Sequence, residues 1–372
     1  MRTWSDGRKT RIHLLTIARD AAAQVAGLHG KHLATAETVR AMADRAGAVA
    51  AVNGTFFDIA DGPDFGGYAG DPLGVYGTGG TLLSEASNGR TALVVGPAGS
   101  RPRITGVRTE ARLRAASGAE RELDGINRTP GRILGCGGVG GDRTSTGRGS
   151  GARPRHNQLC LDPDEIVRFT PEWGANSPRG QQGSTEAVLD GAGRVLTLRT
   201  PAGGPIPAGG STLSAVGAGA GWLNSHARQG SLITLSSDAT DLRGIELMGP
   251  GVSMIGGGSS LVADGRPAVS PAAHGNPPSA LTHRDPRTLA GVRADGTLLL
   301  VVVDGRTAEN TGASLQEAAA LLADLGAQSA MNLDGGGSSA MVIDGTVVNR
   351  PMDKGGKRPA ERPVATAIGV FD

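Results

Sequence analysis

The clearest hydrophobic pattern in the chain is a strand–helix–strand unit near its C-terminal end. Residues Thr297 to Val303 form an almost continuous apolar run, which is typical of a strand buried on both faces. Residues 314–325 then place apolar side chains on one helical stripe, and Ser314 with Glu317 forms a capping box at its start. A glycine that is expected to end the helix precedes a second apolar run at 329–333. The pattern therefore predicts two strands joined by a helical crossover.

An acidic residue stands directly after each of these strands. Asp304 follows the first strand and Asp334 follows the second. If the two strands are parallel, the crossover brings both carboxylates to the same edge of the sheet, where ligands bind in such sheets. An antiparallel arrangement would separate the two acids, and the sequence leaves both arrangements open.

A similar unit occurs near the N-terminus. A helix-spaced stretch over residues 39–46, a glycine and a buried strand over 48–52 lead to Asn53. Asn53 lies six positions after its glycine, and Asn332 lies six positions after Gly326. The matching spacing indicates that the two asparagines end equivalent strands. The alternative is a chance match between two alanine-rich helix–strand units.

The segment from Asn332 to Ser339 reads Asn-Leu-Asp-Gly-Gly-Gly-Ser-Ser and combines a carboxylate, three glycines and two hydroxyls. Successive glycines can turn their N–H groups toward one point and form an anion-binding nest. Residues 341–348 predict a hairpin with a two-residue turn, which would hold the loop in place. A flexible glycine–serine turn is the alternative. The candidate anion site consists of Gly335, Gly336, Gly337 and Ser338.

The pattern changes in the middle of the chain. From about residue 118 to residue 241, short β runs are separated by Gly and Pro, and no good helical stripe occurs. We therefore predict an α+β fold with a mixed sheet core and flanking helices. The core is expected to be built from both chain ends, residues 1–117 and 242–372, with 118–241 as an inserted β-rich accessory region.

Composition excludes two classes of partner. The chain has 372 residues, enough to bury a sizeable core, and a formal net charge of +2 from scattered arginines. Aromatic residues make up only 3%, so stacking surfaces for nucleic acid are scarce, and we expect no nucleic-acid partner. No run approaches the roughly 18 apolar residues of a membrane helix, and no signal peptide is visible.

Several short motifs, taken together and in chain order, resemble the phosphodiester glycosidase family. The most specific are Asn53-Gly54-Thr55-Phe56-Phe57-Asp58 and the octet that begins at Asn332. The supporting segments are Pro286-Arg287-Thr288, residues 303–306, 311–317 and 361–364, and, within the middle region, 168–174 and 206–210, which look like bacterial members. Leu289 departs from the alanine that is frequent in the family, and this affects only local packing.

The resemblance implies a hydrolase that cleaves sugar-1-phosphodiesters. The expected products are free sugar and a phosphomonoester, and the expected substrate is an α-N-acetylglucosamine-1-phosphate group on a glycan, cell-wall polymer or exopolysaccharide. The phosphomonoester leaves as an anion, so the site needs positive charge and N–H donors more than a strong general acid. A carboxylate must attack the anomeric carbon or activate water. The resemblance also implies an extracellular or cell-envelope location.

These requirements assign candidate roles to the motif residues. Asp304 and Asp334 are candidates for the nucleophile or base, and Arg287 is the candidate fork for the phosphate. Asn53 and Asn332 either bind sugar hydroxyls or orient the acids. The other candidate substrate-binding residues are Thr288, Gly305, Arg306, Gly335, Gly336, Gly337 and Ser338. Glu317 is better explained as a helix-capping residue than as a site residue.

Three questions stay open at this stage. No cofactor is certain, but a divalent cation held by Asp304, Asp334 and Asn332 would change the mechanism. The alternatives to the proposed hydrolase are a non-catalytic glycan- or cell-wall-binding module and a glycosidase or phosphatase of a different substrate class. Cys136 and Cys160 are expected to form a disulfide, because the family is largely extracytoplasmic.

Overall fold

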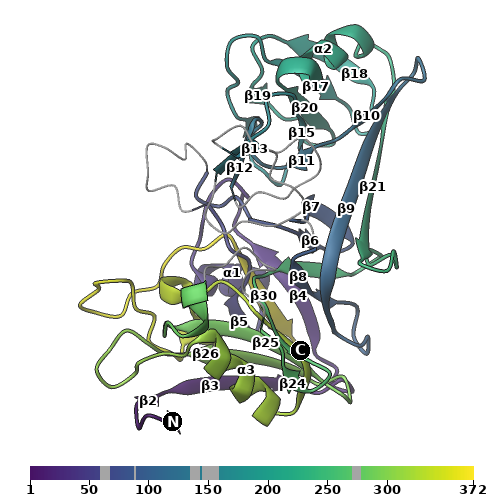
Figure 1. Cartoon of the computed structure of the whole chain (residues 1–372). Helices are drawn as coiled ribbons and strands as arrows, with labels where there is room; N and C mark the ends of the chain where they lie inside the picture. Colours follow the sequence, from purple (N-terminus) through teal and green to yellow (C-terminus); the bar gives the residue numbers. More distant parts are fainter. Residues whose placement is uncertain (59–67, 88, 135–142, 145–158, 270–277) are drawn as a thin grey trace.

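The computed structural model describes residues 1–58, 68–87, 89–134, 143–144, 159–269 and 278–372 (Figure 1). Two sheets built from both chain ends form the lower part of the molecule in this view. Within the described ranges, no helix is long and apolar enough to cross a membrane.

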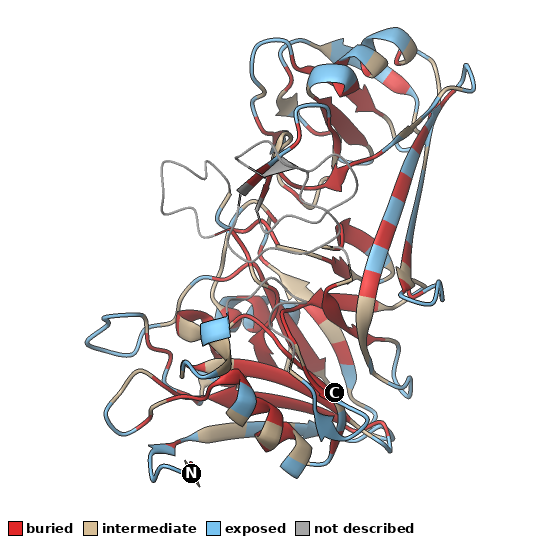
Figure 2. Cartoon of the chain, viewed as in Figure 1, coloured by how far each residue is buried: buried red, intermediate tan, exposed pale blue. Residues whose placement is uncertain are grey.

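The first sheet has six strands and the second has five. The first runs in the order β24 (Arg266–Pro267), β23 (Ser260–Ala263), β27 (Ala327–Asn332), β25 (Arg287–Arg293), β26 (Leu298–Val303) and β3 (Ile12–Ile17). The second runs in the order β29 (Thr346–Val347), β28 (Met341–Ile343), β5 (Ala50–Asn53), β30 (Thr366–Phe371) and β4 (Gln24–His29). The two sheets share one buried cluster, to which Leu300 and Met331 contribute from the first sheet and Val52 and Ile368 from the second. The strands β25 and β26 of the first sheet and β5 and β30 of the second are buried along most of their length for this reason (Figure 2).

Each of these sheets also carries one helix. α3 (Leu315–Asp324) packs its apolar stripe on the first sheet, in a cluster that contains Leu322 and Val301. α1 (Val39–Ala46) packs on the second sheet, in a cluster that contains Met42 and Ala51. The predicted capping box at the start of α3 is confirmed, since the Ser314 side chain accepts the Glu317 N–H and the Glu317 carboxylate accepts the Ser314 N–H.

A third sheet continues upward into the accessory region. Its order is β10 (Glu120–Glu122), β9 (Arg103–Ala115), β8 (Thr91–Val95), β22 (Ser253–Gly256), β6 (Tyr76–Thr78) and β7 (Thr81–Ser84), with β21 (Ile233–Asp241) also paired to β9. The long β9–β21 ribbon runs along the side of the molecule (Figure 1).

The accessory region contains a five-stranded sheet and the third helix. The sheet order is β11 (Gly125–Ile126), β15 (Ile166–Phe169), β20 (Ser211–Ala215), β17 (Thr185–Leu189) and β18 (Val195–Arg199), covered by α2 (Gly217–His226). The remaining short elements are β1 (Arg2–Thr3), β2 (Lys9–Thr10), β12 (Arg132–Leu134), β13 (Arg143–Thr144), β14 (Leu159–Leu161), β16 (Asn176–Ser177), β19 (Gly204–Pro205) and the 3-10 turns η2 (Pro278–Leu281) and η3 (Gly336–Ser338). One hydrophobic cluster joins Val94 of the third sheet to Leu213 of the accessory sheet, and the predicted domain boundaries stay a prediction.

The predicted α+β fold with a mixed sheet core is wrong. The described residues are mostly β-structure with three α-helices, and among the paired strands only β11 and β15 run parallel. The error has a local cause: α3 does connect two strands of like direction, but β25 lies between them and forms antiparallel ladders with both. A crossover in sequence therefore did not produce a parallel pair.

The absence of a helix from the accessory region was also predicted wrongly. α2 begins with Gly217, and two further glycines stand at positions 219 and 221. Glycine is a poor helix former, so local propensity argued against a helix here. Packing of Ala220 and Leu223 in the accessory core stabilises it.

Candidate active site

Three candidate residues meet at one edge of the first sheet. Because β26 and β27 are each antiparallel to β25, they point the same way and end at the same edge. Asp304 follows β26 and Asp334 lies just beyond β27. Arg287 begins β25 and pairs with Val303, the last residue of β26. The same-edge arrangement of the two acids thus arises without direct pairing of their strands.

Asn53 connects the second sheet to this edge. It is fully buried at the end of β5, and its Nδ2 donates to the Asp334 carbonyl oxygen at 2.8 Å. Its Oδ1 accepts from Thr288 Oγ1 at 2.6 Å and from the Ala340 N–H at 3.2 Å. Because these bonds use its oxygen and one N–H, the geometry favours orientation of the acid over binding of a sugar hydroxyl.

The Asp334 carboxyl is buried but not fully paired. Oδ1 accepts the Gly335 N–H at 2.9 Å, whereas Oδ2 is buried without a hydrogen-bond partner of normal geometry in the described structure. Burial raises the pKa of Asp334 to about 6, against the lowering effects of the Ser338 hydroxyl, the Gly335 N–H and the Arg362 charge. A carboxyl of this kind can exchange a proton near neutral pH.

Asp304 lies in a different environment, because both of its oxygens accept hydrogen bonds. Oδ2 lies 3.2 Å from His13 Nε2, while Oδ1 accepts the Arg350 N–H at 2.9 Å and Asn349 Nδ2 at 3.4 Å. Burial acts to raise the pKa of Asp304, but the His13, Arg350 and Asn349 hydrogen bonds together outweigh it and lower the pKa. The Asp304 carboxylate is therefore charged, and both of its oxygens are already engaged in hydrogen bonds within the protein.

The glycine loop uses most of its N–H groups internally. Gly336 has a φ of +63° and donates its N–H to the Pro286 carbonyl at 2.8 Å. The Ser338 and Ser339 N–H groups turn back to the carbonyls of Gly335 and Gly336 at 3.3 and 3.2 Å. Within the described ranges, the Gly337 N–H is the one loop N–H that donates to no acceptor, and the predicted anion site at the loop stays a prediction.

Positive charge reaches the loop from three arginines instead. Arg287 donates through Nε to the Ala313 carbonyl at 2.9 Å and through Nη2 to the His283 carbonyl at 3.1 Å. Two of its nitrogens thus hold backbone carbonyls, which leaves Nη1 for a ligand. Burial lowers the pKa of Arg287, with a further lowering effect of Arg306, while Asp285 opposes it.

Arg306 and Arg362 cover the other side of the loop. Arg306 donates to Asp285 Oδ1 at 2.9 Å and to the Met352 carbonyl at 3.1 Å. A Cβ added to Gly336 would lie 2.8 Å from Arg306 Nη2. A Cβ added to Gly337 would lie 2.8 Å from Arg362 Nη2. Both glycines therefore allow a guanidinium group to approach the loop backbone closely.

The remaining predicted residues have mainly internal contacts. Gly305 leaves no room for a side chain, because a Cβ there would lie 2.7 Å from the Pro286 nitrogen. Asn332 donates to the Leu333 carbonyl at 2.6 Å, but its Oδ1 is buried with no partner in the described structure. Asn332 Oδ1 and Asp334 Oδ2 are thus two unpaired oxygens close in sequence.

Sequence reasoning missed His13 and Asn349. His13 pairs with Val302 across the β3–β26 ladder, so the ladder places it beside Asp304. Asn349 links Asp304 to the segment after the glycine loop, since it donates to the Ser339 carbonyl at 2.9 Å and accepts the Met341 N–H at 2.8 Å. Neither His13 nor Asn349 belongs to a recognisable sequence motif. Their part in the site is visible only from the strand pairing and hydrogen bonds that bring them to Asp304.

A divalent cation held by Asp304, Asp334 and Asn332 stays a hypothesis. Among the described residues, no group of three or more His, Cys, Asp and Glu side chains is placed to hold a metal, and a set that includes an asparagine is not of that kind. Asp304 does not fit as a ligand, because its oxygens accept from N–H donors.

The predicted disulfide joins Cys136 and Cys160. Cys136 lies outside the described residues, and Cys160 is buried in β14. The pairing therefore stays a prediction.

Similarity to known proteins bears on the chain as a whole. The model of the phosphodiester glycosidase family matches residues 182–371. A solved protein of Burkholderia pseudomallei K96243 that is named as exported has 30% sequence identity, with 97% of this chain and 74% of that chain covered and a TM-score of 0.83. A hypothetical protein from Synechocystis has 20% identity, with 99% of this chain and 60% of that chain covered, and shares the fold at a TM-score of 0.72. No curated protein matches the chain.

Proposed function

Because the chain belongs to the phosphodiester glycosidase family, we propose that this hydrolase cleaves sugar-1-phosphodiesters into free sugar and a phosphomonoester. The proposed substrates are α-N-acetylglucosamine-1-phosphate groups on a glycan or cell-envelope polymer. We also propose that the protein is exported, in keeping with the name of the Burkholderia relative.

The observation that carries the proposal is the environment of Asp334. Its Oδ2 is buried and has no hydrogen bond of normal geometry in the described structure, although the Ser338 hydroxyl is close enough to act on the carboxyl, and burial raises its pKa to about 6. Arg306 and Arg362 approach the adjacent glycines, and Arg287 keeps Nη1 uncommitted. A reactive carboxyl beside three cations suits a substrate whose leaving group is an anion.

Asp334 is the proposed reacting acid. Above a pH of about 6 it is mostly ionised, and it either attacks the anomeric carbon or accepts a proton from the attacking water. The bond between the anomeric carbon and the bridging oxygen breaks, and the electron pair leaves with the phosphomonoester. The guanidinium groups of Arg287, Arg306 and Arg362 stabilise the charge that builds on the phosphate.

Asp304 is the proposed positioning residue. Its lowered pKa keeps it ionised, and its oxygens hold His13, the Arg350 N–H and Asn349. Asn349 in turn binds the backbone on either side of Ala340. The charge of Asp304 therefore acts on the loop through Asn349, while Asp334 meets the substrate.

The test is hydrolysis of UDP-N-acetylglucosamine and of the methyl phosphodiester of N-acetylglucosamine-1-phosphate, followed as free sugar. Asp334→Asn should lower kcat by about a thousandfold or more, because it keeps the shape and removes the reacting charge. Binding of the anionic substrate should be kept or improved, since the buried negative charge is gone. Calorimetric titration of the inactive variant measures this.

Asp344→Asn provides the matched control. Asp344 is exposed in the hairpin turn that follows the loop, and its φ of 47° suits asparagine equally well. It should hydrolyse the substrate at the unmutated rate. Near-normal turnover by Asp334→Asn would refute the assignment. Substrate binding without any turnover by the unmutated protein would instead favour a glycan-binding module.

A further inference from the structure

A cavity beside the candidate active site has the N-terminal hairpin as one of its walls. Its volume is about 740 Å³, which is in the range of ligand pockets. The other walls are the segment between η2 and β25 and the β26–α3 connection with the first turn of α3. Arg306 lines this cavity, and its Nη2 would lie 2.8 Å from a Cβ added to Gly336 of the glycine loop. The cavity and the candidate active site therefore share Arg306.

The hairpin wall is held in place by Trp4 and Arg284. Trp4 is buried, and its Nε1 donates to the Gly312 carbonyl at 3.0 Å. The Arg284 guanidinium lies 6.0 Å from the centre of the Trp4 ring. Arg284 donates through Nη1 to Asp6 Oδ2 at 2.8 Å and through Nε to Glu317 Oε2 at 2.8 Å. It thus ties the hairpin to the first turn of α3, and the cavity is formed before any ligand binds.

The charged groups around the cavity neutralise one another. Arg284 is shared by Asp6 and Glu317, and Arg8 Nε lies 3.5 Å from Asp6 Oδ2. Arg306 donates to Asp285 Oδ1 at 2.9 Å. Three arginines therefore meet three carboxylates, and the lining favours a ligand part without charge of its own.

Hydroxyl and amide groups make up much of the remaining lining. Ser5, Thr282 and Gln316 are exposed, and their side chains form no hydrogen bond to another described residue. Every described residue that lines the cavity is polar or charged, and none has a hydrocarbon side chain. Such a surface offers hydrogen bonds to the hydroxyl groups of a sugar or polyol and no apolar area for a lipid chain.

Arg287 relates the cavity to the proposed phosphate site. Its Nη2 donates to the His283 carbonyl at 3.1 Å and its Nε to the Ala313 carbonyl at 2.9 Å. His283 and Ser314, which follows Ala313, both line the cavity. A phosphate group held by Arg287 Nη1 and Arg306 is therefore placed at the edge of this cavity.

We propose that the cavity binds the alcohol that stays on the phosphate after cleavage, and that it selects a hydroxyl-rich, uncharged alcohol such as a sugar or polyol. Ser5, Thr282 and Gln316 bind its hydroxyl groups. The proposal rests on the proposed function, because the phosphodiester brings its alcohol to Arg306. It adds the chemical class of that alcohol, which the candidate active site does not define.

The test compares three phosphodiesters of N-acetylglucosamine-1-phosphate that differ only in this alcohol. The alcohols are methanol, the 6-hydroxyl of methyl glucoside, and cyclohexylmethanol, and hydrolysis is followed as free N-acetylglucosamine. The unmutated protein should cleave the glucoside ester with a kcat/KM at least about tenfold above that of the other two esters, because several hydroxyl groups are bound.

A double variant removes two of the binding groups. Thr282→Val with Gln316→Ala changes exposed positions, so the fold should be retained. This variant should lower kcat/KM for the glucoside ester about tenfold and leave hydrolysis of the methyl ester unchanged.

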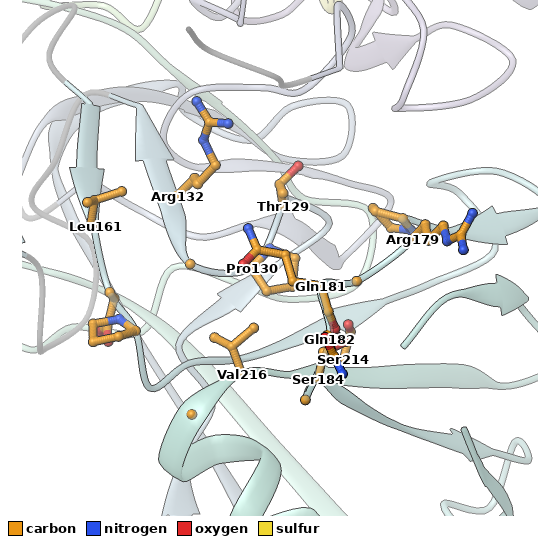
Figure 3. A pocket seen from close by; sticks show the side chains of 17 residues that line it. Thr129, Pro130, Arg132, Leu161, Arg179, Gln181, Gln182, Ser184, Ser214 and Val216 are labelled. Carbon is orange, nitrogen blue, oxygen red and sulfur yellow. Dashed lines mark hydrogen bonds between the residues drawn. The ribbon is translucent and has the colours of Figure 1, made fainter. Parts of the chain in front are cut away.

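Thr234→Val with Gln182→Ala is the matched control. Thr234 is exposed on β21. Gln182 is exposed at the accessory cavity, a separate space of about 890 Å³ in the accessory region that Gly131 also lines (Figure 3). The accessory cavity shares no lining residue with the cavity beside the active site, so the control should cleave all three esters at the unmutated rates.

Calorimetric titration separates this proposal from the proposed function. The probe is methyl glucoside 6-(methyl phosphate), which carries the alcohol and the phosphate but no sugar-1-phosphate bond. The Thr282→Val, Gln316→Ala variant should bind it about tenfold more weakly than the control. Equal affinity of the two double variants, no binding by the unmutated protein, or a preference for the cyclohexylmethyl ester would overturn the cavity proposal. If none of the three esters is hydrolysed, the proposed function fails, and the titration still decides whether the cavity binds the alcohol.

Discussion

At the residue scale, two carboxyl groups at one sheet edge have pKa values that are shifted in opposite directions. Asp334 has one unpaired oxygen, and burial raises its pKa to about 6. The hydrogen bonds of Asp304 overcome its burial and lower its pKa. Separation of the pKa values of two neighbouring acids is a common way to give them different roles. Under the proposed function, it favours Asp334 as the reacting group and Asp304 as the positioning group.

The raised pKa of Asp334 predicts a pH-dependent cost in stability. In the unfolded chain its pKa is about 3.9, so the fold favours the protonated form. The associated stability is fully present below about pH 4 and is lost as pH rises through about 6. A shift of about two pKa units corresponds to about 3 kcal/mol. Asp334→Asn should therefore raise the unfolding free energy at pH 7.5 and leave it nearly unchanged at pH 4.

Urea denaturation at the two pH values measures this effect. Asp344→Asn is again the control, because it makes the same substitution at an exposed position in the hairpin turn. A gain of equal size at pH 4 and pH 7.5 would contradict the buried-charge explanation. If Asp334→Asn is more stable but no longer turns over substrate, it shows the trade-off between stability and activity that is common at active sites.

At the element scale, the glycine loop is a tight turn whose shape admits two arginines. Gly336 requires a positive φ, and Gly337 lies under the Arg362–Asp353 ion pair. The hairpin predicted after the loop is confirmed as β28 and β29, with Asp344 and Gly345 in the turn. The loop is therefore held by Pro286 on one side and by a hairpin on the other.

Two alanine substitutions test the glycine loop in different ways. Gly336→Ala should cost about 1 kcal/mol because alanine disfavours a positive φ. Its Cβ would also lie 2.8 Å from Arg306 Nη2, so Gly336→Ala should reduce turnover as well, and the Gly345→Ala control isolates the strain. In Gly337→Ala the new Cβ would overlap Asp353 Oδ1, so the Arg362–Asp353 ion pair must move. This pair is partly exposed and contributes little stability, so Gly337→Ala should mainly reduce turnover.

Thermal denaturation and initial hydrolysis rates provide the two readouts. Gly345→Ala is the control for strain, because Gly345 has a φ of +71° in the hairpin turn outside the site. It should lose stability as Gly336→Ala does and keep its turnover. If Gly337→Ala hydrolysed substrate normally, Arg362 would have no part in phosphate binding.

At the scale of the whole molecule, a buried ion network links the N-terminal core to the accessory region. Arg128 lies between Glu85, which follows β7, and Glu165, which precedes β15. All three are buried, and the two carboxylates act together to raise the pKa of Arg128 although burial opposes them. The same network fixes a wall of the accessory cavity through Gly131.

Arg128→Met should therefore destabilise the molecule strongly. It leaves two buried carboxylates without their cation, which typically costs about 3–5 kcal/mol. Urea unfolding should shift to lower concentration, and adding Glu85→Gln and Glu165→Gln should recover part of the loss because the unpaired charges are gone. Arg228→Met is the surface control. An unchanged midpoint in Arg128→Met would show that the network contributes no net stability.

Local patterns were sufficient for the features that depend on neighbours in sequence. Residue type and spacing were enough for the capping box of α3, the glycines Gly47 and Gly326 at helix ends, and the hairpin after the loop. The matched positions of Asn53 and Asn332 at strand ends were also predictable, because helix-ending glycines set the register of both units.

Tertiary structure alone decided the sheet order and the state of each candidate group. The insertion of β25 between β26 and β27 made the sheet antiparallel, because pairing over long sequence separations leaves no local pattern. The same pairing placed His13 beside Asp304 and Asn53 behind Asp334. The sequence determined which residues are candidates for the chemistry. Burial and distant hydrogen bonds, which depend on the whole fold, decided which carboxyl has a raised pKa and which has a lowered pKa.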